Sequence, residues 1–363
     1  MKLFTIGPVQ MHPETLEVRK MAIPYFRTKE FSDFTFEMDR KFKQVIGTAQ
    51  ESQAVYLTAS GTAAMEAAVI NCFDRTDNVL VIVGGSFGKR FSAICSIHDI
   101  PHTDIEVPFG KALTEEDLLP YDGKGYTGLL VNLDESSTGQ LYDVHMLHRF
   151  CARNGILFVV DAITSFLCDP YRMDEFGVDV TIASSQKGLA LSPGLAIITL
   201  NERAVRRTME KDPKCMYFDF KDYYKNMERG QMPFTPAIGI FMELDDMLSH
   251  ILSIGLDRHL AHIADNATYF RTRIGEFEGY LPGYPLSNAI TPVMFHDPIC
   301  TELFHALRKR GLVVNPTGGE RANTMIRVAH VGDLEREDYD ELIKAICEER
   351  ASLLNNGFRK EKE

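Results

Sequence analysis

The stretch LFVVDAITS, residues 157–165, passes from an unbroken apolar run into an aspartate and a polar turn. A second stretch, VTIASSQKG at residues 180–188, has the same form and brings a single lysine into its turn. Apolar runs of this length are typical of strands that are buried on both faces in a parallel sheet. Ligands bind at the carboxyl ends of such strands, so the two stretches predict the fold class and the place of a site.

The surrounding chain supports a sheet of such strands. From residue 53 to about residue 200, short apolar runs alternate with segments whose apolar spacing suits helices, which is typical of a mostly parallel sheet covered by helices. This part of the chain is therefore predicted to be an α/β domain. The expected strands cover residues 54–58, 78–83, 128–133, 156–160, 178–183 and 195–200, and the expected helices cover residues 63–73, 89–98 and 144–154.

A different pattern begins near residue 288 and predicts a compact α+β unit, with strands at 290–295, 312–314 and 324–330 and helices at 300–310 and 336–355. The 363 residues suffice for two domains at about 150 residues each. We therefore expect a large α/β domain with a mostly parallel central sheet over residues 21–255 and a smaller C-terminal α+β domain over residues 256–363. Residues 1–20 are expected to form an N-terminal arm that contributes to the active site and to the small domain.

Composition and charge exclude several classes of function. Asp and Glu number 51 against 39 Lys and Arg, and the net charge of -12 disfavours nucleic acid, whose affinity for proteins comes mostly from basic side chains. The chain has no stretch of about 18 uncharged apolar residues, and Gly7-Pro8 interrupts its start, so we expect a cytoplasmic protein without a membrane partner. The seven cysteines include no CxxC pair and HExxH is absent, so no metal site is predicted.

The first candidate binding feature is the turn TASGTAA, residues 58–64, between an apolar strand and an alanine-rich helix. Free backbone amides, hydroxyl groups and the positive end of the helix dipole meet at Ser60, Gly61 and Thr62, and all three favour a phosphate. An ordinary Ser/Thr N-cap is the alternative, and for this turn in isolation it is the more common interpretation.

The second feature is VGGSFGKR, residues 83–90. Its glycines lack GxGxxG spacing, and no acidic residue ends a strand about 20 residues further on, so a nicotinamide dinucleotide is not expected. Phe87, between glycines, can instead lie flat on a planar ring. A buried core phenylalanine is the alternative for this position.

Asp161 and Lys187 complete the set of features. A lysine between small residues at a strand end is suited to imine formation, and a carboxylate at the neighbouring strand end can keep a pyridine nitrogen protonated. With the phosphate turn at residues 60–62 and the aromatic face of Phe87, these residues match the four needs of pyridoxal 5'-phosphate. The conjunction is far more specific than any one of its members.

The same residues carry a resemblance that covers nearly the whole chain. The sequence resembles the class V aminotransferases of the alanine:glyoxylate, serine:pyruvate and 2-aminoethylphosphonate:pyruvate group, which are fold-type I pyridoxal phosphate enzymes. The matching signatures, in order, are Gly7-Pro8, RTKEF at 27–31, the turn at 60–62, Phe87 with Arg90, ESSTG at 135–139, DAITS at 161–165, SQKG at 185–188, Thr235-Pro236 and Arg327.

The resemblance implies a role for each matching residue. Lys187 would form the aldimine with the cofactor and then move a proton as general base, while Asp161 would keep the pyridine nitrogen protonated. The other residues would hold the rest of the cofactor: Ser60, Gly61, Thr62 and Gln186 at the phosphate, Ile163 and Phe87 on the two ring faces, Ser136 near the ring hydroxyl, and Thr235 reaching over from a second subunit.

The resemblance also implies the reaction and the assembly. Arg327 would hold the substrate carboxylate with two hydrogen bonds, although without the resemblance an exposed strand arginine is the simpler interpretation, and Gly7 would lie beside the substrate. The implied enzyme is a homodimer with its active site at the subunit interface. It would move an amino group from alanine, serine or 2-aminoethylphosphonate to pyruvate or glyoxylate through a pyridoxamine intermediate. A phosphonate donor would need one more cation, for which Arg27, Lys29 and Arg90 are candidates.

One alternative lies within the same fold. A pyridoxal phosphate-dependent lyase of the cysteine desulfurase type would need a histidine before the lysine, commonly a histidine on the ring, and a cysteine on a mobile loop. Gln186 and Phe87 stand at the first two positions, and Cys300 and Cys347 lie in segments that are predicted to be helical. The aminotransferase is therefore favoured, and the intact lysine and aspartate disfavour a non-catalytic binding protein.

Overall fold

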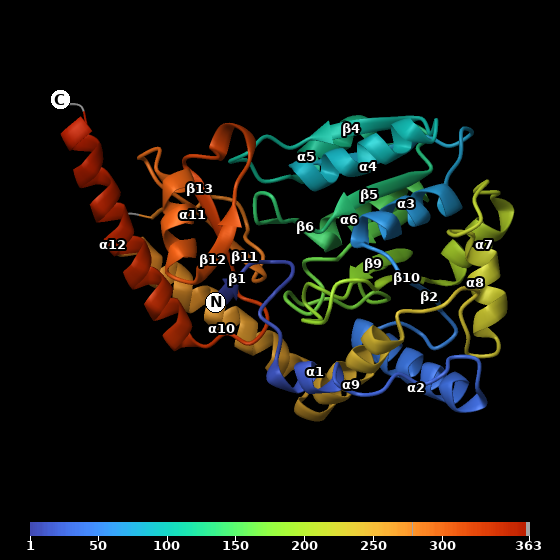
Figure 1. Ribbon diagram of the computed structural model, residues 1–363. Coiled ribbons are helices and arrows are strands. Elements are labelled where there is room, and N and C mark those ends of the chain that lie inside the picture. The colour runs from blue at the N-terminus through green and yellow to red at the C-terminus, as the bar shows by residue number, and fades with distance from the viewer. Residues whose placement is uncertain (278, 361–363) are drawn as a thin grey trace.

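The computed structural model describes residues 1–277 and 279–360, and its largest element is a seven-stranded sheet (Figure 1). The neighbouring strands β3, β4, β5, β8 and β9 are parallel, whereas β10 runs antiparallel to both β2 and β9. The predicted α/β class with a mostly parallel central sheet is confirmed. In sheet order the strands are β2 (Gln53–Leu57), β10 (Ala196–Leu200), β9 (Val180–Ser184), β8 (Leu157–Asp161), β5 (Gly128–Asn132), β3 (Val79–Val83) and β4 (His102–Glu106).

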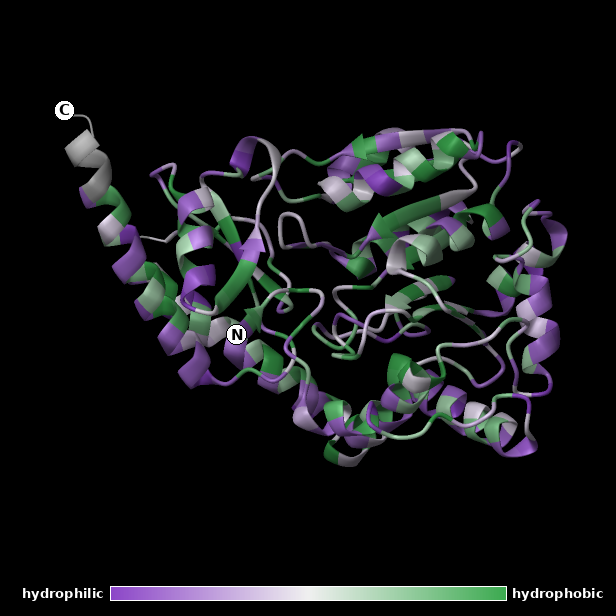
Figure 2. Ribbon diagram, in the orientation of Figure 1, coloured by the Kyte–Doolittle hydropathy of each residue, from purple (hydrophilic) through white to green (hydrophobic). Residues whose placement is uncertain are grey.

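Alternate residues of the central strands enter two different hydrophobic cores. In β3, Leu80 and Ile82 belong to one core, while Val79, Val81 and Val83 belong to the other. Because successive side chains of a strand point to opposite faces, a strand covered on both sides needs apolar residues throughout. This explains the unbroken apolar runs of the sequence, which Figure 2 shows as hydrophobic colouring along the central strands.

Helices cover both faces of this sheet. The core on one face includes side chains from α3 (Gly61–Cys72) and α4 (Ser86–Ile97), and that on the other face includes α2 (Lys29–Ile46), α6 (Val144–Asn154) and α9 (Ile238–Ile254). The helices α7 (Glu202–Glu210) and α8 (Phe220–Met227) pack beside β10 and β2, and α1 (Pro13–Val18) contacts α9. Directly after α9 comes α10 (Leu256–Gly275), which extends toward the second sheet (Figure 1).

The second sheet has four strands and its own hydrophobic core. Its order is β1 (Lys2–Phe4), β12 (Leu312–Pro316), β13 (Met325–Ala329) and β11 (Ile290–Met294), so the N-terminal strand lies beside strands from the end of the chain. The helices α11 (Cys300–Lys309) and α12 (Arg336–Lys360) pack against it. Residues 278 and 361–363 of the expected small domain lie outside the described residues.

Several short elements complete the fold. They are α5 (Glu115–Leu118), the 3-10 helices η1 (Leu119–Tyr121) and η2 (Gly319–Arg321), and the strand pair β6 (Asp134–Glu135) and β7 (Gln140–Leu141). Among the described residues, no helix has both the length and the apolar character needed to cross a membrane.

Candidate functional site

Three neighbouring parallel strands deliver polar side chains to one edge of the central sheet. Asn132 ends β5 and pairs in register with Asp161, which ends β8. Lys187 follows the end of β9, the next strand in the sheet. The predicted meeting of an aspartate and a lysine at the carboxyl edge therefore follows from strand order.

Asp161 is 5% exposed and its carboxylate is held from two sides. The backbone N–H of Ile163 donates to Oδ1 at 2.8 Å, and the side-chain amide of Asn132 donates to Oδ2. Burial raises the pKa of Asp161 to about 6, while these two donors oppose the rise. The carboxylate is therefore ionised above about pH 6 and is fixed in direction.

The loop that carries Lys187 is tied down on both sides of the lysine. The Ser185 hydroxyl donates to the Ser192 carbonyl at 2.6 Å, and Gly188 leaves no room for a side chain, because an added Cβ would lie 2.0 Å from the Phe166 carbonyl oxygen. Glu243 of α9, 2% exposed, accepts hydrogen bonds from the Ser192 backbone N–H and hydroxyl, both at 2.8 Å. This buried acid fixes the lysine loop to α9, and the sequence did not single it out.

Lys187 stands where two cavities meet. The inner cavity, about 260 Å³, reaches Asp161 and the turn at residues 60–62, and the outer cavity, about 890 Å³, reaches Arg327. Both cavities are lined by Gly7, Phe87, Ser136 and Lys187. Enclosure by protein lowers the pKa of Lys187 to about 8, and the nearby acids Asp134 and Asp161 limit this fall. Part of the lysine amine is therefore neutral, and able to act as a nucleophile, near pH 7.

One end of the inner cavity has the features of a phosphate site. Ser60 is the N-cap residue of α3, but its hydroxyl makes no capping bond, so the ordinary N-cap interpretation does not account for it. Arg90 donates to the Thr62 hydroxyl at 2.7 Å and adds a positive charge beside the helix N-terminus. Gln186, whose side-chain oxygen accepts from Ser184 at 2.6 Å, also lines this cavity.

Phe87 and Ile163 also line the inner cavity, so each can cover one face of a planar ring bound there. A Cβ on Gly61 would lie 2.5 Å from Ile163 Cδ1, so glycine is needed there for the close approach. Phe87 is held by Glu135, whose carboxylate accepts from the backbone N–H groups of Phe87 and Gly88 at 3.2 and 2.9 Å. Glu135 thus binds the N-terminus of α4, where a negative charge is stabilised by the helix dipole.

Buried polar atoms without partners test whether the inner cavity suits pyridoxal 5'-phosphate. Asn132 Oδ1 and both carboxylate oxygens of Asp134 lack hydrogen bonds, although both residues line the cavity and are at most 4% exposed. Burial and the neighbouring Asp169 hold the pKa of Asp134 well above its ordinary value, so a partner in the cavity would stabilise this carboxyl group. A polar ring with a hydroxyl group would satisfy such atoms, and the donor set fits this cofactor.

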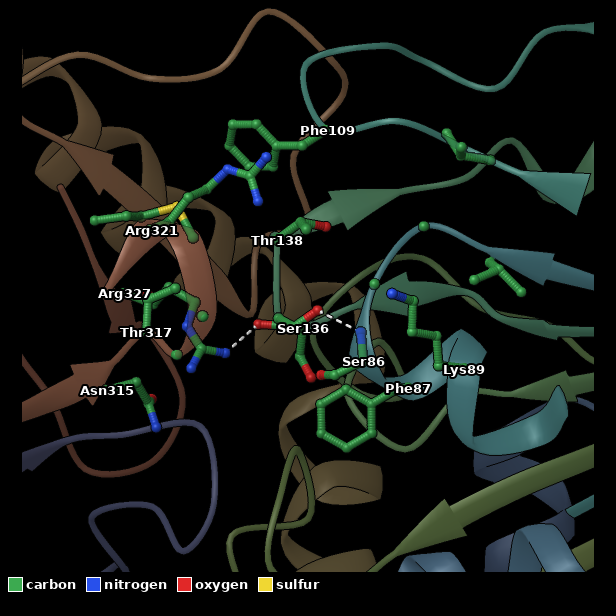
Figure 3. A pocket seen from close by; sticks show the side chains of 18 of the residues that line it. Ser86, Phe87, Lys89, Phe109, Ser136, Thr138, Asn315, Thr317, Arg321 and Arg327 are labelled. Atoms are coloured by element: carbon green, nitrogen blue, oxygen red, sulfur yellow. Dashed lines mark hydrogen bonds between the residues drawn. The ribbon is translucent and has the colours of Figure 1, made fainter. Parts of the chain in front are cut away.

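Arg327 of β13 lines the outer cavity, opposite the central sheet (Figure 3). It donates from Nη1 to the Ser136 carbonyl at 2.6 Å and from Nη2 to the Pro316 carbonyl at 2.7 Å. These two bonds fix the guanidinium plane, whereas the buried Nε has no partner. Burial lowers the pKa of Arg327, but an arginine remains charged at neutral pH. The structure therefore leaves an oriented positive charge with unused donors beside Lys187.

The three candidates for an additional cation, Arg27, Lys29 and Arg90, do not lie on the substrate side of Lys187. Arg27 donates to the carbonyls of Met232 and Pro233, both at 3.0 Å, and Lys29 pairs with Asp33 on the exposed side of α2. Arg90 belongs to the inner cavity, as described above. A second guanidinium does line the outer cavity, but it is Arg321, together with the ammonium of Lys89. Arg321 could not be predicted from the sequence, because it lies more than 200 positions away from Lys89 along the chain.

Thr235 and the two helical cysteines lie outside both cavities. Thr235 is exposed, and its carbonyl accepts a 3.4 Å hydrogen bond from Thr58, just before the phosphate turn. Cys300 and Cys347 lie on α11 and α12, as expected from their helical patterns. Within the described residues, no group of His, Cys, Asp and Glu side chains is arranged to hold a metal ion.

Replacing Gly7 by alanine is expected to disturb Lys187 directly. An added Cβ would lie 2.8 Å from both Cδ and Cε of the lysine, closer than carbon atoms pack. Because a misplacement of about 1 Å in a reacting group can cost about 100-fold, we expect kcat to fall about 10- to 100-fold in Gly7→Ala. Gly239→Ala is the matched control, since its added methyl group meets nothing within 4 Å. Equal kcat values in steady-state assays of the two variants would contradict this role of Gly7.

Comparison with known proteins gives matches along most of the chain. The family described as Aminotransferase class-V matches residues 25–342. L-aspartate–glyoxylate aminotransferase of Paracoccus denitrificans is 27% identical over 349 residues, which cover 92% of this chain and 86% of that protein.

Solved structures with the same fold cover almost the entire chain. Aspartate aminotransferase of subgroup IV from Thermus thermophilus superposes with a TM-score of 0.89 at 29% identity, covering 96% of this chain and 99% of that one. Alanine–glyoxylate aminotransferase from Nostoc sp. superposes with a TM-score of 0.90 at 26% identity, covering 96% and 94% of the two chains.

Proposed function

Because the chain belongs to the class-V aminotransferase family, we propose that it moves an amino group from a small donor to pyruvate or glyoxylate. The donor candidates are alanine, serine and 2-aminoethylphosphonate. The observation that carries the proposal is the position of Lys187, whose amine stands at the junction of a cavity suited to a cofactor and a cavity that holds Arg327. The amino group would move in two half-reactions, first from the donor to the enzyme and then to the acceptor.

The cofactor of the family is pyridoxal 5'-phosphate, which supplies an aldehyde for the lysine amine and an electron-withdrawing ring. We propose that Ser60, Thr62 and Gln186 bind its phosphate, with Arg90 adding positive charge. Free N–H groups of the α3 N-terminus at Gly61 and Thr62 would contribute as well.

The ring position follows from the remaining residues of the inner cavity. Phe87 and Ile163 would cover the two faces, and Ser136 and Asp134 would face the hydroxyl edge. Asp161, ionised above about pH 6, would hold a proton on the ring nitrogen. The protonated ring nitrogen would give the buried carboxylate a hydrogen-bonded partner of opposite charge, which a buried charge needs.

Lys187 would both bind the cofactor and move the proton at the substrate Cα atom. Its pKa of about 8 lies close to neutral pH, where a group can accept a proton and return it with little cost in either direction. Gly7 packs on the lysine side chain and leaves its amine a narrow range of positions. Enclosure of the amine also keeps bulk water away from the proton in transit.

Arg327 would bind the substrate carboxylate. Its two carbonyl contacts hold the guanidinium plane before substrate arrives, so little side-chain entropy is lost on binding. The unpartnered Nε and the remaining Nη hydrogen atoms offer the two parallel donors that a carboxylate accepts.

We further propose a cytoplasmic homodimer. Ile23 and Tyr25 are large apolar side chains two positions apart that are 64 and 68% exposed, and a second subunit would cover them. Thr235 is exposed beside Thr58, where a second subunit could approach the phosphate turn. The seven cysteines are free thiols, and most of them are buried, which suits a reducing compartment.

The visible spectrum of the purified protein tests the proposed function. The holoenzyme is expected to be dimeric by light scattering and to show a cofactor band that disappears when one of the three amines is added alone. Pyruvate or glyoxylate should then restore the band. A band that none of these donors changes would favour the lyase or a donor outside these three, and the absence of a band after addition of pyridoxal 5'-phosphate would contradict the assignment of the inner cavity.

A further inference from the structure

Arg321 places a second guanidinium in the outer cavity, on the same side as Arg327 (Figure 3). It ends the 3-10 helix η2 in the segment TGGERAN, residues 317–323, which leads into β13. Its Cζ lies 3.7 Å from the centre of the Phe109 ring, which comes from the large central-sheet unit. The side chain therefore reaches from the second unit to the central-sheet unit at the cavity wall, and it is half-buried rather than free in solvent.

The Phe109 ring that supports Arg321 is itself held in place. Tyr284 packs edge-on against it with ring centres 5.8 Å apart, and the Tyr284 hydroxyl donates to the Thr138 carbonyl at 2.8 Å. When a guanidinium lies flat on a fixed aromatic ring, its N–H groups point outward along its own plane. They therefore stay free to bind a ligand. Arg321 is thus oriented without using its hydrogen-bond donors.

The charge of Arg321 is not neutralised by the protein. Within the described part of the chain, neither an ion pair nor a side-chain hydrogen bond involves its guanidinium. Glu106 and Glu320 line the same cavity but are exposed, and Lys89 adds a further positive charge on the opposite wall (Figure 3). An oriented, unpaired cation in a cavity next to a catalytic lysine is the arrangement expected for an anionic ligand group.

We infer that the amino donor carries a second acidic group in addition to its α-carboxylate. This inference rests on the proposed function: Arg327 would bind the α-carboxylate beside Lys187, and Arg321 would bind a carboxylate or phosphate at the far end of the donor side chain. Alanine and serine would then be weak donors that leave Arg321 unused. A carboxylate and a phosphate would both supply the side-chain anion, and comparison of matched donors distinguishes the two.

Two matched pairs of donors test this inference on the holoenzyme. Aspartate is compared with asparagine, and O-phosphoserine with serine, by the concentration dependence with which each discharges the cofactor band. We expect the acidic member of at least one pair to be favoured in kcat/KM by about 10- to 100-fold, as a charged hydrogen bond allows. A preference within the first pair identifies a carboxylate, and one within the second a phosphate.

Arg321→Gln should remove that preference through KM, because the side-chain anion binds before and during the reaction alike. Alanine should be used equally by the variant and by the wild type, which shows that the variant folds and binds cofactor. Arg336→Gln is the matched control: Arg336 also lies over an aromatic ring, Tyr269 at 5.3 Å, but outside both cavities. Arg321→Lys should keep an intermediate preference, since it retains charge without the planar donors.

The outcomes separate this inference from the function on which it rests. An unchanged acidic preference in Arg321→Gln, or no acidic preference in a wild-type enzyme that uses alanine, would overturn the role of Arg321 and leave the aminotransferase in place. If no amine in any pair, alanine included, discharges the band, the proposed function itself is wrong.

Discussion

Lys187→Ala is expected to abolish transamination while leaving the protein folded. Lys187 lines both cavities, and in the proposed function its amine is the nucleophile and moves the substrate proton. A positioned general base alone contributes about 100- to 10,000-fold. We therefore expect kcat/KM to fall at least about 10,000-fold, measured by coupled assay of the keto product. The visible band that depends on the lysine amine should also be lost.

Lys187→Arg separates nucleophilicity from charge. Its guanidinium stays protonated near neutral pH and cannot attack an aldehyde, so this variant should be as inactive as the alanine variant. Added methylamine should restore part of the activity of Lys187→Ala, because removal of the side chain opens space between Gly7 and the inner cavity. A Lys187→Ala protein that retains more than about one tenth of wild-type turnover would contradict the lysine assignment, since loss of a positioned base costs more than this.

The sheet could be predicted from the sequence where burial dictates composition. Strands β8 and β9 are covered on both faces, so their apolar runs were visible without any contact information. The edge strand β4 was missed because His102 and Asp104 interrupt it, which an edge position allows. The antiparallel direction of β10 could not be predicted either, since periodicity carries no information on strand direction.

Candidate site residues could be predicted from the sequence where a polar residue comes directly at the end of a single apolar strand. Asp161 and Lys187 were found in this way, since each lies at a strand end. Asn132 was missed although it also ends a strand, because its partner Asp161 is evident only once β5 and β8 are paired. Arg321 could not be predicted either, because it packs on Phe109, more than 200 positions away in the sequence, and this contact is evident only in the folded chain.

Asp161→Asn is expected to lower kcat about 1,000-fold, an effect of the size seen when one oriented electrostatic contact to the developing charge is lost. The amide cannot hold a proton on the ring nitrogen, so the electron-withdrawing power of the ring falls. Cofactor retention should weaken less, because Ser60, Thr62, Gln186 and Arg90 still surround the phosphate end.

The environment of Asp161 makes asparagine a clean substitution. Its Oδ1 can still accept from the Ile163 backbone N–H, and the facing Asn132 amide can turn over so that its unpartnered Oδ1 accepts from the new amide nitrogen. Only the negative charge is then lost. Asp39→Asn is the matched control, since Asp39 is 7% exposed and its pKa is also raised by burial, yet it lies outside both cavities.

The pH dependence of cofactor affinity distinguishes the charge of Asp161 from its shape. Since burial raises its pKa to about 6, the carboxylate of the cofactor-free wild type becomes protonated as the pH falls through that value and can no longer hold a protonated ring nitrogen. Affinity for pyridoxal 5'-phosphate, measured by fluorescence titration of the cofactor-free protein, should therefore decrease below about pH 6 in the wild type and in Asp39→Asn. Asp161→Asn should show a smaller decrease, because the amide does not titrate and only Lys187 and the cofactor phosphate then become protonated. An Asp161→Asn enzyme with wild-type kcat, or with an unchanged pH profile of cofactor affinity, would exclude Asp161 as the partner of the ring nitrogen.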